Sequence, residues 1–201
     1  MSNFWEQAFK DKQEMWGEEP SKSSIIAKEF FIEQGVNKIL IPGIGYGRNA
    51  KVFIDNNIDV TGIEISKTAI DLSKKYFENP LLIHQGSVTE MPFDQQKYDG
   101  IFCYSLIHLL SKSERLKFID DCFNQLEDNG WMLFTTITKE ASTYGQGIEI
   151  DTDTFELFGG VNIYFYDETS ITEDFGNYGL FDIKKVEEDY PLYIIKCQKV
   201  R

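Results

Sequence analysis

Short apolar runs alternate with helical patterns along most of this 201-residue chain, and this alternation restricts the fold more than any other feature. Runs rich in Ile, Val and other apolar residues predict strands at 38–41, 59–63, 81–84, 100–104 and 131–137. Apolar residues at helical spacing lie between most of these runs. Strands that alternate with helices form a parallel sheet with helices on both faces. The sequence therefore predicts an α/β fold with a doubly wound, mostly parallel sheet.

The last two predicted strands, 181–186 and 192–200, are separated by only a few residues around Pro191. A parallel pair needs a crossover of a dozen or more residues. These two strands must therefore pair antiparallel. We expect a seven-stranded, Rossmann-like sheet that ends in a C-terminal antiparallel hairpin.

Polar residues mark where two of the helices begin. Ser66 predicts the N-cap of a helix whose apolar face runs to Phe77. Ser111 and Glu114 form an S-x-x-E capping box at the start of another helix. The Asn-Gly pair at 129–130 predicts the end of that second helix.

The first predicted strand runs into a glycine-rich loop, Pro42-Gly43-Ile44-Gly45-Tyr46-Gly47. Three glycines at alternate positions allow a tight turn and let a ligand approach the backbone. Open α/β sheets bind ligands at the carboxyl ends of their strands, which is where this loop lies. The alternative is that the glycines only make the turn. Arg48 stands where the dinucleotide fingerprint has its third glycine, which disfavours NAD and favours an adenosine ligand without phosphates.

Glu64 ends the second predicted strand, 17 residues beyond Gly47. A carboxylate at this place can accept hydrogen bonds from both ribose hydroxyls of an adenosine ligand, and each such bond contributes about 1.5–3 kcal/mol. The alternative is a solvated acid that caps the next helix. With the glycine loop ahead of it, we favour ribose binding.

Segments 42–49 and 60–66 resemble the class I S-adenosylmethionine-dependent methyltransferases. Within that superfamily they are most similar to the small bacterial enzymes related to tellurite-resistance methyltransferases and thiopurine S-methyltransferases. The similarity extends to residues 85–88, 91–93 and 98–101 and to the terminal hairpin, and it covers roughly residues 20–200. It implies a Rossmann-like methyltransferase fold, S-adenosylmethionine as cofactor and S-adenosylhomocysteine as product.

The resemblance also implies which residues contact the cofactor. They are Pro42, Gly43, Ile44, Gly45, Tyr46, Gly47, Glu64, Ile65, Ser87, Val88 and Tyr104. Two positions depart from the usual pattern: Ile41 stands where many members have an acid for the cofactor's amino group, and Ser87 replaces an acid that binds the adenine. Tyr104 lies where members contact the methionine half of the cofactor, and its ring can attract a sulfonium by a cation–π interaction. The alternative role of Tyr104 is a core or rim tyrosine.

No residue stands out as the catalytic group. His108 is the histidine near the appropriate strand end and could act as a general base, although its apolar neighbours favour a packed structural role. His84 lies within the third predicted strand and is expected to be structural. Because a thiol, selenide or telluride ionises without help, the lack of a clear base slightly favours a soft S, Se or Te acceptor.

Two aromatic-rich segments, 1–20 and 139–167, lie outside the repeating pattern of what we expect to be one domain, 1–201. The resemblance implies that the first is an N-terminal lid and that the second, a long and irregular insert, is a cap over the methyl acceptor. The aromatic candidates for substrate binding are Trp16, Tyr144, Tyr164 and Tyr166. The alternative is a satellite core under a long loop.

Composition narrows the possible partners. Acidic residues outnumber basic ones by 33 to 20, and the net charge of −13 opposes binding to nucleic acid or to an anionic membrane. Cys103, Cys122 and Cys197 are scattered and odd in number, so no disulfide framework is expected, and with two histidines no metal site is expected. The N-terminus lacks a signal-peptide pattern, and no run is apolar for long enough to span a bilayer.

We therefore expect a cytoplasmic enzyme, a monomer or weak homodimer, that methylates a small molecule. Two alternatives stay open. The chain could be a non-catalytic module that binds S-adenosylmethionine, or an NAD(P)-dependent oxidoreductase.

Overall fold

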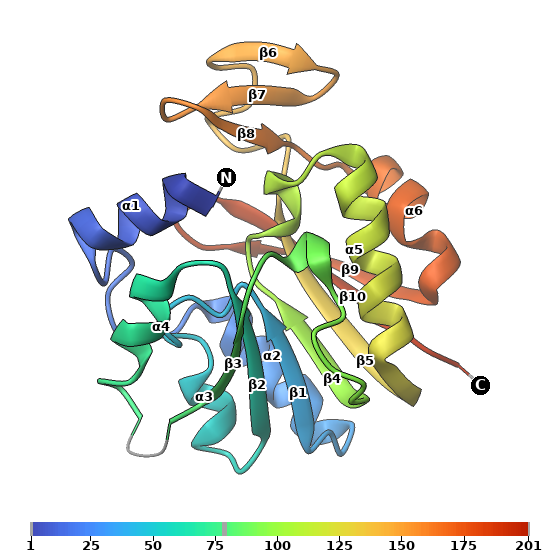
Figure 1. Cartoon of the computed structure of the whole chain (residues 1–201). Coiled ribbons are helices and arrows are strands. Elements are labelled where there is room, and N and C mark those ends of the chain that lie inside the picture. The colour runs from blue at the N-terminus through green and yellow to red at the C-terminus, as the bar shows by residue number, and fades with distance from the viewer. Residues whose placement is uncertain (1, 78–79, 201) are drawn as a thin grey trace.

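Seven strands form one sheet through the computed structural model, which describes residues 2–77 and 80–200 (Figure 1). They are β1 (Lys38–Pro42), β2 (Asp59–Glu64), β3 (Leu82–Gln85), β4 (Tyr98–Cys103), β5 (Leu126–Ile137), β9 (Leu180–Glu187) and β10 (Pro191–Gln198). Their order across the sheet is β3-β2-β1-β4-β5-β10-β9. β10 pairs antiparallel with β5 and β9, and the other pairings are parallel. The predicted doubly wound sheet with its terminal antiparallel hairpin is confirmed.

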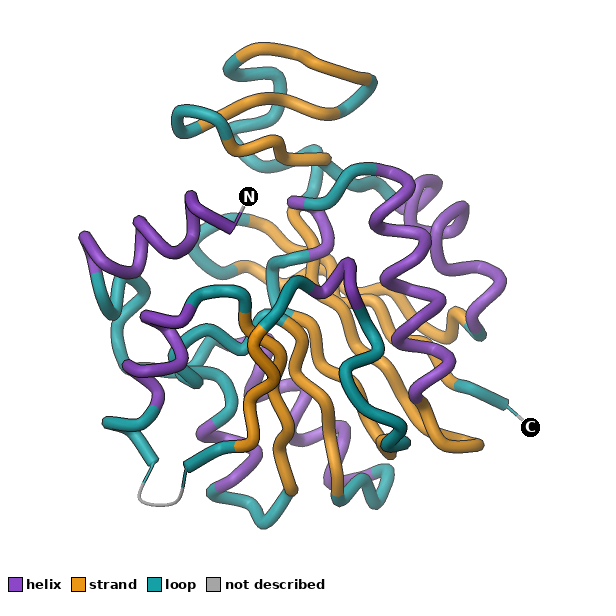
Figure 2. Tube along the Cα trace, viewed as in Figure 1, coloured by secondary structure: helices purple, strands orange, loops and turns teal. Residues whose placement is uncertain are grey.

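Helices cover both faces of this sheet (Figure 2). They are α1 (Ser2–Lys12), α2 (Lys22–Glu33), α3 (Lys51–Ile54), α4 (Lys67–Ser73), α5 (Lys112–Gln125) and α6 (Glu168–Phe175), with short 3-10 turns η1 (Val88–Glu90), η2 (Ile107–Leu109) and η3 (Gly176–Tyr178). Neighbouring residues of β4 show the two layers, because Phe102 packs with α2 and α3 whereas Cys103 packs with α5 and α6. Alternation of this kind is expected of a strand that is buried on both faces.

The helix predicted after Ser66 is shorter than expected. Ser66 caps α4 as predicted, and its side chain accepts a hydrogen bond from the Ala69 N–H. The helix ends at Ser73, however, so Phe77 is not part of its apolar face. The Phe77 ring instead lies over the glycine loop, 2.6 Å from where a Cβ on Gly47 would stand.

The end of α5 also differs from the prediction. The capping box of Ser111 and Glu114 is present at its start. The helix ends at Gln125 rather than at residues 129–130, because β5 already begins at the next residue. Asn129 has a left-handed backbone (φ 66°), and its N–H donates to the Lys199 carbonyl, so the Asn-Gly pair lies inside an irregular part of the strand.

The insert at 139–167 is not irregular, which corrects the expectation from sequence. It contains a separate antiparallel sheet of β6 (Ile148–Asp151), β7 (Thr154–Leu157) and β8 (Val161–Tyr164), drawn at the top of Figure 1. Left-handed residues make its tight turns, among them Asp153 (φ 56°) and Phe158 (φ 52°). Phe155 and Ile163 are buried with residues at the ends of β5 and β10. The small sheet is therefore packed onto the carboxyl edge of β5.

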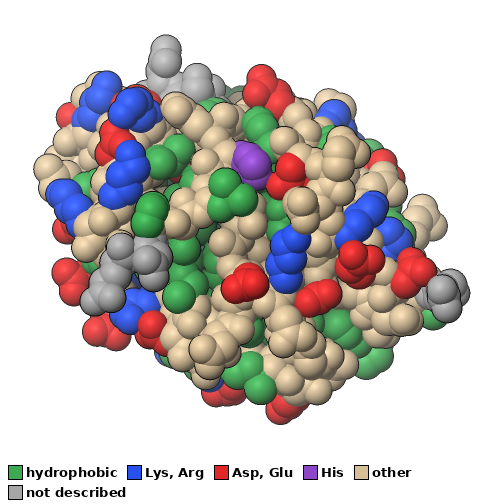
Figure 3. Space-filling view, turned by 60° about the horizontal axis from the view of Figure 1, so that its bottom comes forward, with side chains coloured by type: hydrophobic (Ala, Val, Ile, Leu, Met, Phe, Trp, Pro, Cys, Tyr) green, Lys and Arg blue, Asp and Glu red, His purple; other side chains and the backbone are tan. Residues whose placement is uncertain are grey.

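The charges on one face and the lengths of the helices bear on what the chain can bind. On the face shown in Figure 3, basic side chains are interspersed with acidic ones among the described residues. Within the described part of the chain, no helix is both long and apolar enough to cross a membrane.

Candidate functional site

The glycine loop is bound to the end of β2. The N–H groups of Gly43 and Ile44 both donate to the Ile63 carbonyl, at 2.8 and 3.1 Å. Gly43 has φ +70°, and a Cβ at this residue would lie 2.3 Å from Cδ1 of Leu106. A side chain at this position would therefore be strained and would displace Leu106.

Glu64 lies beneath this loop with its carboxylate buried at 6% exposure. Its Oε2 accepts from the Gly45 N–H at 2.9 Å, and its Oε1 accepts from the Ser66 N–H at 2.8 Å. Burial raises the pKa of Glu64, and these backbone hydrogen bonds oppose the rise. A carboxylate has about four acceptor positions. The Gly45 and Ser66 bonds use two of them, and the Ile65 backbone also contributes a hydrogen bond that lowers the pKa, so Glu64 keeps acceptor capacity for a ribose hydroxyl.

Aromatic residues of the N-terminal segment lie over the same loop. The Phe9 ring is buried and comes within 3.9 Å of where a Cβ on Gly45 would stand. Trp16 stacks on Tyr46, with ring centroids 6.4 Å apart and planes 13° from parallel. The Tyr46 hydroxyl donates to the Gly17 carbonyl at 2.6 Å. The predicted residue Trp16 is thus brought onto Tyr46, which belongs to the glycine loop itself.

Glu6 fixes α1 to the start of α4, and sequence reasoning missed it. Its carboxylate accepts from the Ser66 hydroxyl at 2.7 Å, the Thr68 hydroxyl at 2.8 Å and the Thr68 N–H at 3.1 Å. The Ser66 and Thr68 hydrogen bonds lower the pKa of Glu6 from 4.5 to about 2. An acid four residues before a lysine on a surface helix gives no signal of a distant partner.

Ser87, Val88 and Ile65 lie around the ends of β2 and β3. The Ser87 side chain caps η1 by accepting from the Thr89 N–H at 3.3 Å. Val88 is buried in the core on the α5 face, and Ile65 is partly exposed beside Glu64. These predicted residues therefore sit on the β3 side of the glycine loop.

Tyr104 lies on the opposite side of the loop, at the end of β4. Its hydroxyl donates to Oε2 of Glu188 at 2.7 Å. The Arg48 guanidinium carbon is 5.9 Å from the centre of the Tyr104 ring. Burial and the neighbouring Glu188 carboxylate raise the pKa of Tyr104, so its phenol stays protonated. Glu188 was not found from sequence, since only the hairpin's register brings its tip to this edge.

His108 is enclosed in the core, which supports the structural alternative for it. It is 5% exposed, and its Nδ1 lies 3.4 Å from the Thr136 hydroxyl and 3.4 Å from the Ile137 backbone nitrogen. Burial lowers its pKa to about 3, so the ring is neutral near pH 7. His84 hydrogen-bonds to Asp94 at 2.9 Å, and this pair is partly exposed.

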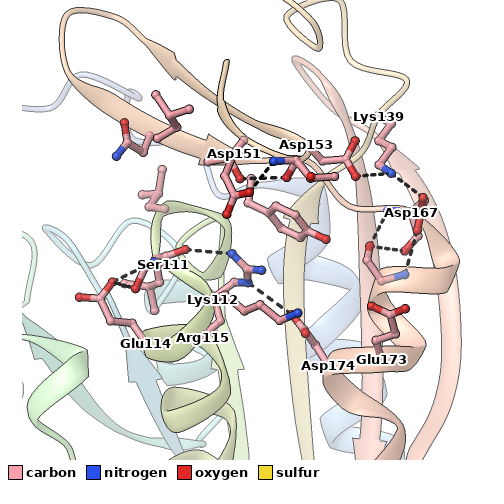
Figure 4. Close-up of a pocket in the computed structure, with 18 of the residues that line it drawn as sticks. Ser111, Lys112, Glu114, Arg115, Lys139, Asp151, Asp153, Asp167, Glu173 and Asp174 are labelled. Carbon is pink, nitrogen blue, oxygen red and sulfur yellow. Dashed lines mark hydrogen bonds and ion pairs between the residues drawn. The ribbon is translucent and has the colours of Figure 1, made fainter. Parts of the chain in front are cut away.

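A cavity of about 720 Å³ lies away from the glycine loop, between the small sheet and the first turns of α5 and α6 (Figure 4). Tyr164 lines it, and the buried Arg115 guanidinium lies 3.8 Å from the centre of that ring. Tyr166 is fully buried, and its hydroxyl donates to Asp174 at 2.8 Å. None of the predicted cofactor-binding residues lines this cavity. Of the three cap tyrosines, Tyr164 alone lines it.

Tyr144 lies on the surface of the cap. It is 38% exposed, its hydroxyl donates to Asp153 at 2.6 Å, and its ring packs edge-on against Phe155 and Phe165. These contacts match the satellite core that was the alternative for this segment.

The positions of the cysteines and of the possible metal ligands are known for the described part of the chain. No group of three or more His, Cys, Asp or Glu side chains there is arranged to hold a metal ion. Cys103, Cys122 and Cys197 are free and buried, and burial raises the pKa of each thiol.

Comparison with known proteins supports a methyltransferase. Residues 40–134 match a family model described as a methyltransferase domain. Ubiquinone biosynthesis O-methyltransferases of Coxiella burnetii are 25% identical over 121 residues, which is 57% of this chain. The aligned part is 51% of those enzymes, so the chain spans about half the length of the curated relatives it matches.

Solved structures of methyltransferases share the whole fold. One is the 1,6-didemethyltoxoflavin-N1-methyltransferase of Burkholderia thailandensis, solved with S-adenosylhomocysteine and 1,6-didemethyltoxoflavin bound. Its TM-score is 0.78 at 13% identity, and the alignment covers 100% of this chain and 87% of that one. The magnesium protoporphyrin IX methyltransferase of Synechocystis PCC 6803, with S-adenosylmethionine bound, gives 0.72 at 11% identity, covering 98% and 96%. The fold is therefore the methyltransferase fold.

Proposed function

We propose that this chain transfers a methyl group from S-adenosylmethionine to a small molecule. The observation that carries the proposal is the buried Glu64 carboxylate, which keeps acceptor capacity directly beneath the backbone of the glycine loop. In an adenosine ligand, two neighbouring ribose hydroxyls are the natural donors to such a group.

We also propose a direction for the cofactor across the sheet edge, which the strand order supports. With the ribose at Glu64 on β2, the adenine lies toward β3, beside Ser87 and Val88, and the methionine half lies toward β4 and Tyr104. The residues proposed to hold the cofactor are Pro42, Gly43, Ile44, Gly45, Tyr46, Gly47, Glu64, Ile65, Ser87, Val88 and Tyr104. When bound, the cofactor supplies an activated methyl group on a sulfonium.

The chain's own contribution is alignment and the exclusion of water. Positioning two reactants can lower a barrier by about 7–11 kcal/mol. The Tyr104 ring offers a face for the sulfonium charge. Residues 1–20, described from residue 2, act as the lid, because Phe9 and Trp16 already lie over the loop. Residues 139–167 act as the cap.

The acceptor is proposed to be a nucleophile that ionises unaided, such as a thiol, selenide or telluride. His108 is enclosed, and its pKa of about 3 makes the imidazole a weak base, so it is poorly suited to take a proton from an acceptor. This is the chemistry of the tellurite-resistance and thiopurine S-methyltransferase group that the sequence resembles. Trp16 is the aromatic residue proposed to contact an acceptor, because it stacks on Tyr46 of the glycine loop. Tyr164 lines the cap cavity, which none of the proposed cofactor-binding residues reaches.

Calorimetric titration with S-adenosylmethionine and S-adenosylhomocysteine tests the binding step. Glu64→Ala should weaken both ligands by about 10- to 100-fold, since it removes charge-assisted hydrogen bonds to the ribose. Glu33→Ala, which removes an exposed acid at the end of α2, is the matched control and should bind as the unmodified chain does. Absence of binding to the unmodified chain at high micromolar ligand would refute the function.

A panel of acceptors then separates the enzyme from a binding module. Methyl transfer should be measured to an aromatic thiol, to selenide, to telluride and to a catechol. Transfer to the soft acceptors supports the proposal. Transfer only to the catechol would contradict the acceptor class, and tight cofactor binding with no transfer to any of them would favour the non-catalytic module. Binding of NAD(P) in place of S-adenosylhomocysteine would favour the oxidoreductase.

A further inference from the structure

Four segments that are far apart in sequence meet beside Tyr104. The Ser21 N–H, at the start of α2, donates to the Asn49 side chain at 2.9 Å. The Ser23 N–H donates to Oε1 of Glu188 at 2.8 Å, and the Ser23 hydroxyl also donates to that oxygen. Four segments are thus in contact around Tyr104. They are the end of β4, the start of α2, the residues after the glycine loop and the tip of the β9–β10 hairpin.

This place lies on the methionine side of the proposed cofactor. Leu40 of β1 pairs with Ile101 of β4, and three further residues along each strand bring Gly43 level with Tyr104. The ribose acid Glu64 is on the other side of β1. The methionine half of S-adenosylmethionine ends in an α-ammonium and an α-carboxylate, so the chain needs a cation and an anion here.

Arg48 is a cation with unused hydrogen-bond donors. Its side chain is half-buried, and its Nη1 donates to the Trp16 carbonyl at 2.8 Å. A guanidinium has five N–H donors, and this bond uses one of them. Within the described part of the chain, no carboxylate lies within 4.0 Å of Arg48. In a chain of 33 acids and 20 bases, an arginine without an acid partner is available for a ligand's carboxylate.

Glu188 is the matching anion. Its Oε1 takes both Ser23 hydrogen bonds, whereas the Tyr104 hydroxyl is the donor recorded on Oε2. Oε2 therefore keeps capacity for an ammonium group. The end of β1 offers no acid for that purpose, because Ile41 is buried there among apolar residues.

Building on the proposed function, we propose that Arg48 binds the α-carboxylate of the cofactor and that Glu188 binds its α-ammonium, with Tyr104 between them. The site then recognises the whole amino acid end of S-adenosylmethionine rather than the adenosine alone. Since Arg48 also bonds the Trp16 carbonyl, the same guanidinium joins the cofactor to the lid. The competing assignment is that Arg48 binds an anionic methyl acceptor.

Four adenosyl ligands distinguish these assignments by calorimetric titration. S-adenosylmethionine and S-adenosylhomocysteine carry both charged groups, decarboxylated S-adenosylmethionine keeps only the ammonium, and 5′-methylthioadenosine has neither. Arg48→Gln should weaken the first two by about 10- to 100-fold and leave the last two within twofold. Glu188→Gln should weaken every ligand except 5′-methylthioadenosine. Arg48→Lys keeps the charge but loses the planar set of guanidinium N–H donors. Its affinities should therefore lie between those of Arg48→Gln and those of the unmodified chain.

Lys51→Gln and Asp189→Asn are the matched controls, because each removes a charge close by in sequence. Both should leave all four affinities unchanged, and melting temperatures should show that every variant folds. Equal weakening of all four ligands by Arg48→Gln would overturn the proposal, since Arg48 would then act through the loop or lid. Unchanged S-adenosylhomocysteine affinity with a raised acceptor KM would overturn it in favour of acceptor binding. Failure of the unmodified chain to bind either S-adenosylhomocysteine or 5′-methylthioadenosine would instead refute the proposed function.

Discussion

Glu6→Ala should release the N-terminal helix from the body of the protein. The substitution removes three hydrogen bonds, from the Ser66 hydroxyl at 2.7 Å, the Thr68 hydroxyl at 2.8 Å and the Thr68 N–H at 3.1 Å. A hydrogen bond to a charged group contributes about 1.5–3 kcal/mol when it is well sheltered. Because the Glu6 side chain is 28% exposed and the three bonds are not independent, we expect about 2 kcal/mol in total.

A loss of about 2 kcal/mol corresponds to a roughly 30-fold larger population of undocked α1. Hydrogen exchange measures this directly, since the amides of α1 should exchange about 30-fold faster while those of β4 and β5 do not change. The charge-dependent part should also vary with pH. The folded protein lowers the pKa of Glu6 to about 2, so the docking energy is complete above pH 4.5 and is lost as the pH falls toward 2.

Asp11→Ala is the matched control on the same helix. Asp11 is an exposed acid that accepts a hydrogen bond from Gln7 of α1 itself, so its removal should leave the docking of α1 intact. If Glu6→Ala and Asp11→Ala gave the same exchange rates in α1, the three hydrogen bonds would not hold the lid. The release of S-adenosylhomocysteine should become faster in Glu6→Ala alone.

Three further perturbations test the core and the loop. Burial lowers the pKa of His108 to about 3, so the contribution of the neutral ring to stability is complete above pH 6.5 and declines below it. Urea unfolding should show a loss of about 2 kcal/mol between pH 8 and pH 5. His108→Gln should remove that part of the pH dependence. Gly43→Ala should weaken S-adenosylhomocysteine binding and lower the melting temperature more than Gly35→Ala, because both glycines have φ near +70° but only Gly43 has a neighbour within 4 Å of an added Cβ. Arg115→Met should cost about 3–5 kcal/mol in urea unfolding by leaving Asp174 buried without its cation, and adding Asp174→Leu should recover a large part of that loss; equal stability of the two variants would contradict the buried pair.

The main sheet could be predicted because its signals are local. The strands at the centre of the parallel core contain short apolar runs, and the few residues between β9 and β10 allow only an antiparallel pair. The glycine loop and Glu64 were also predictable, since a strand end and a ligand-binding edge coincide in this class of fold.

The contacts between distant segments could not be predicted. Glu6 and Glu188 are ordinary surface acids in the sequence, and only tertiary packing gives them partners 60 or more residues away. The small sheet was missed because its strands are four residues long and its turns depend on left-handed residues that include Phe158. Tyr166 was proposed for substrate binding, but its hydroxyl serves a buried bond to Asp174, which an aromatic-rich sequence does not reveal.

A crystal structure of the chain soaked with S-adenosylhomocysteine tests the proposed cofactor site most directly. At least one ribose hydroxyl should lie about 2.5–3 Å from an oxygen of Glu64, with the sugar against the backbone of residues 43–47. No ligand bound at residues 43–47 and Glu64 at saturating concentration, or a ribose bound anywhere other than at Glu64, would contradict the assignment.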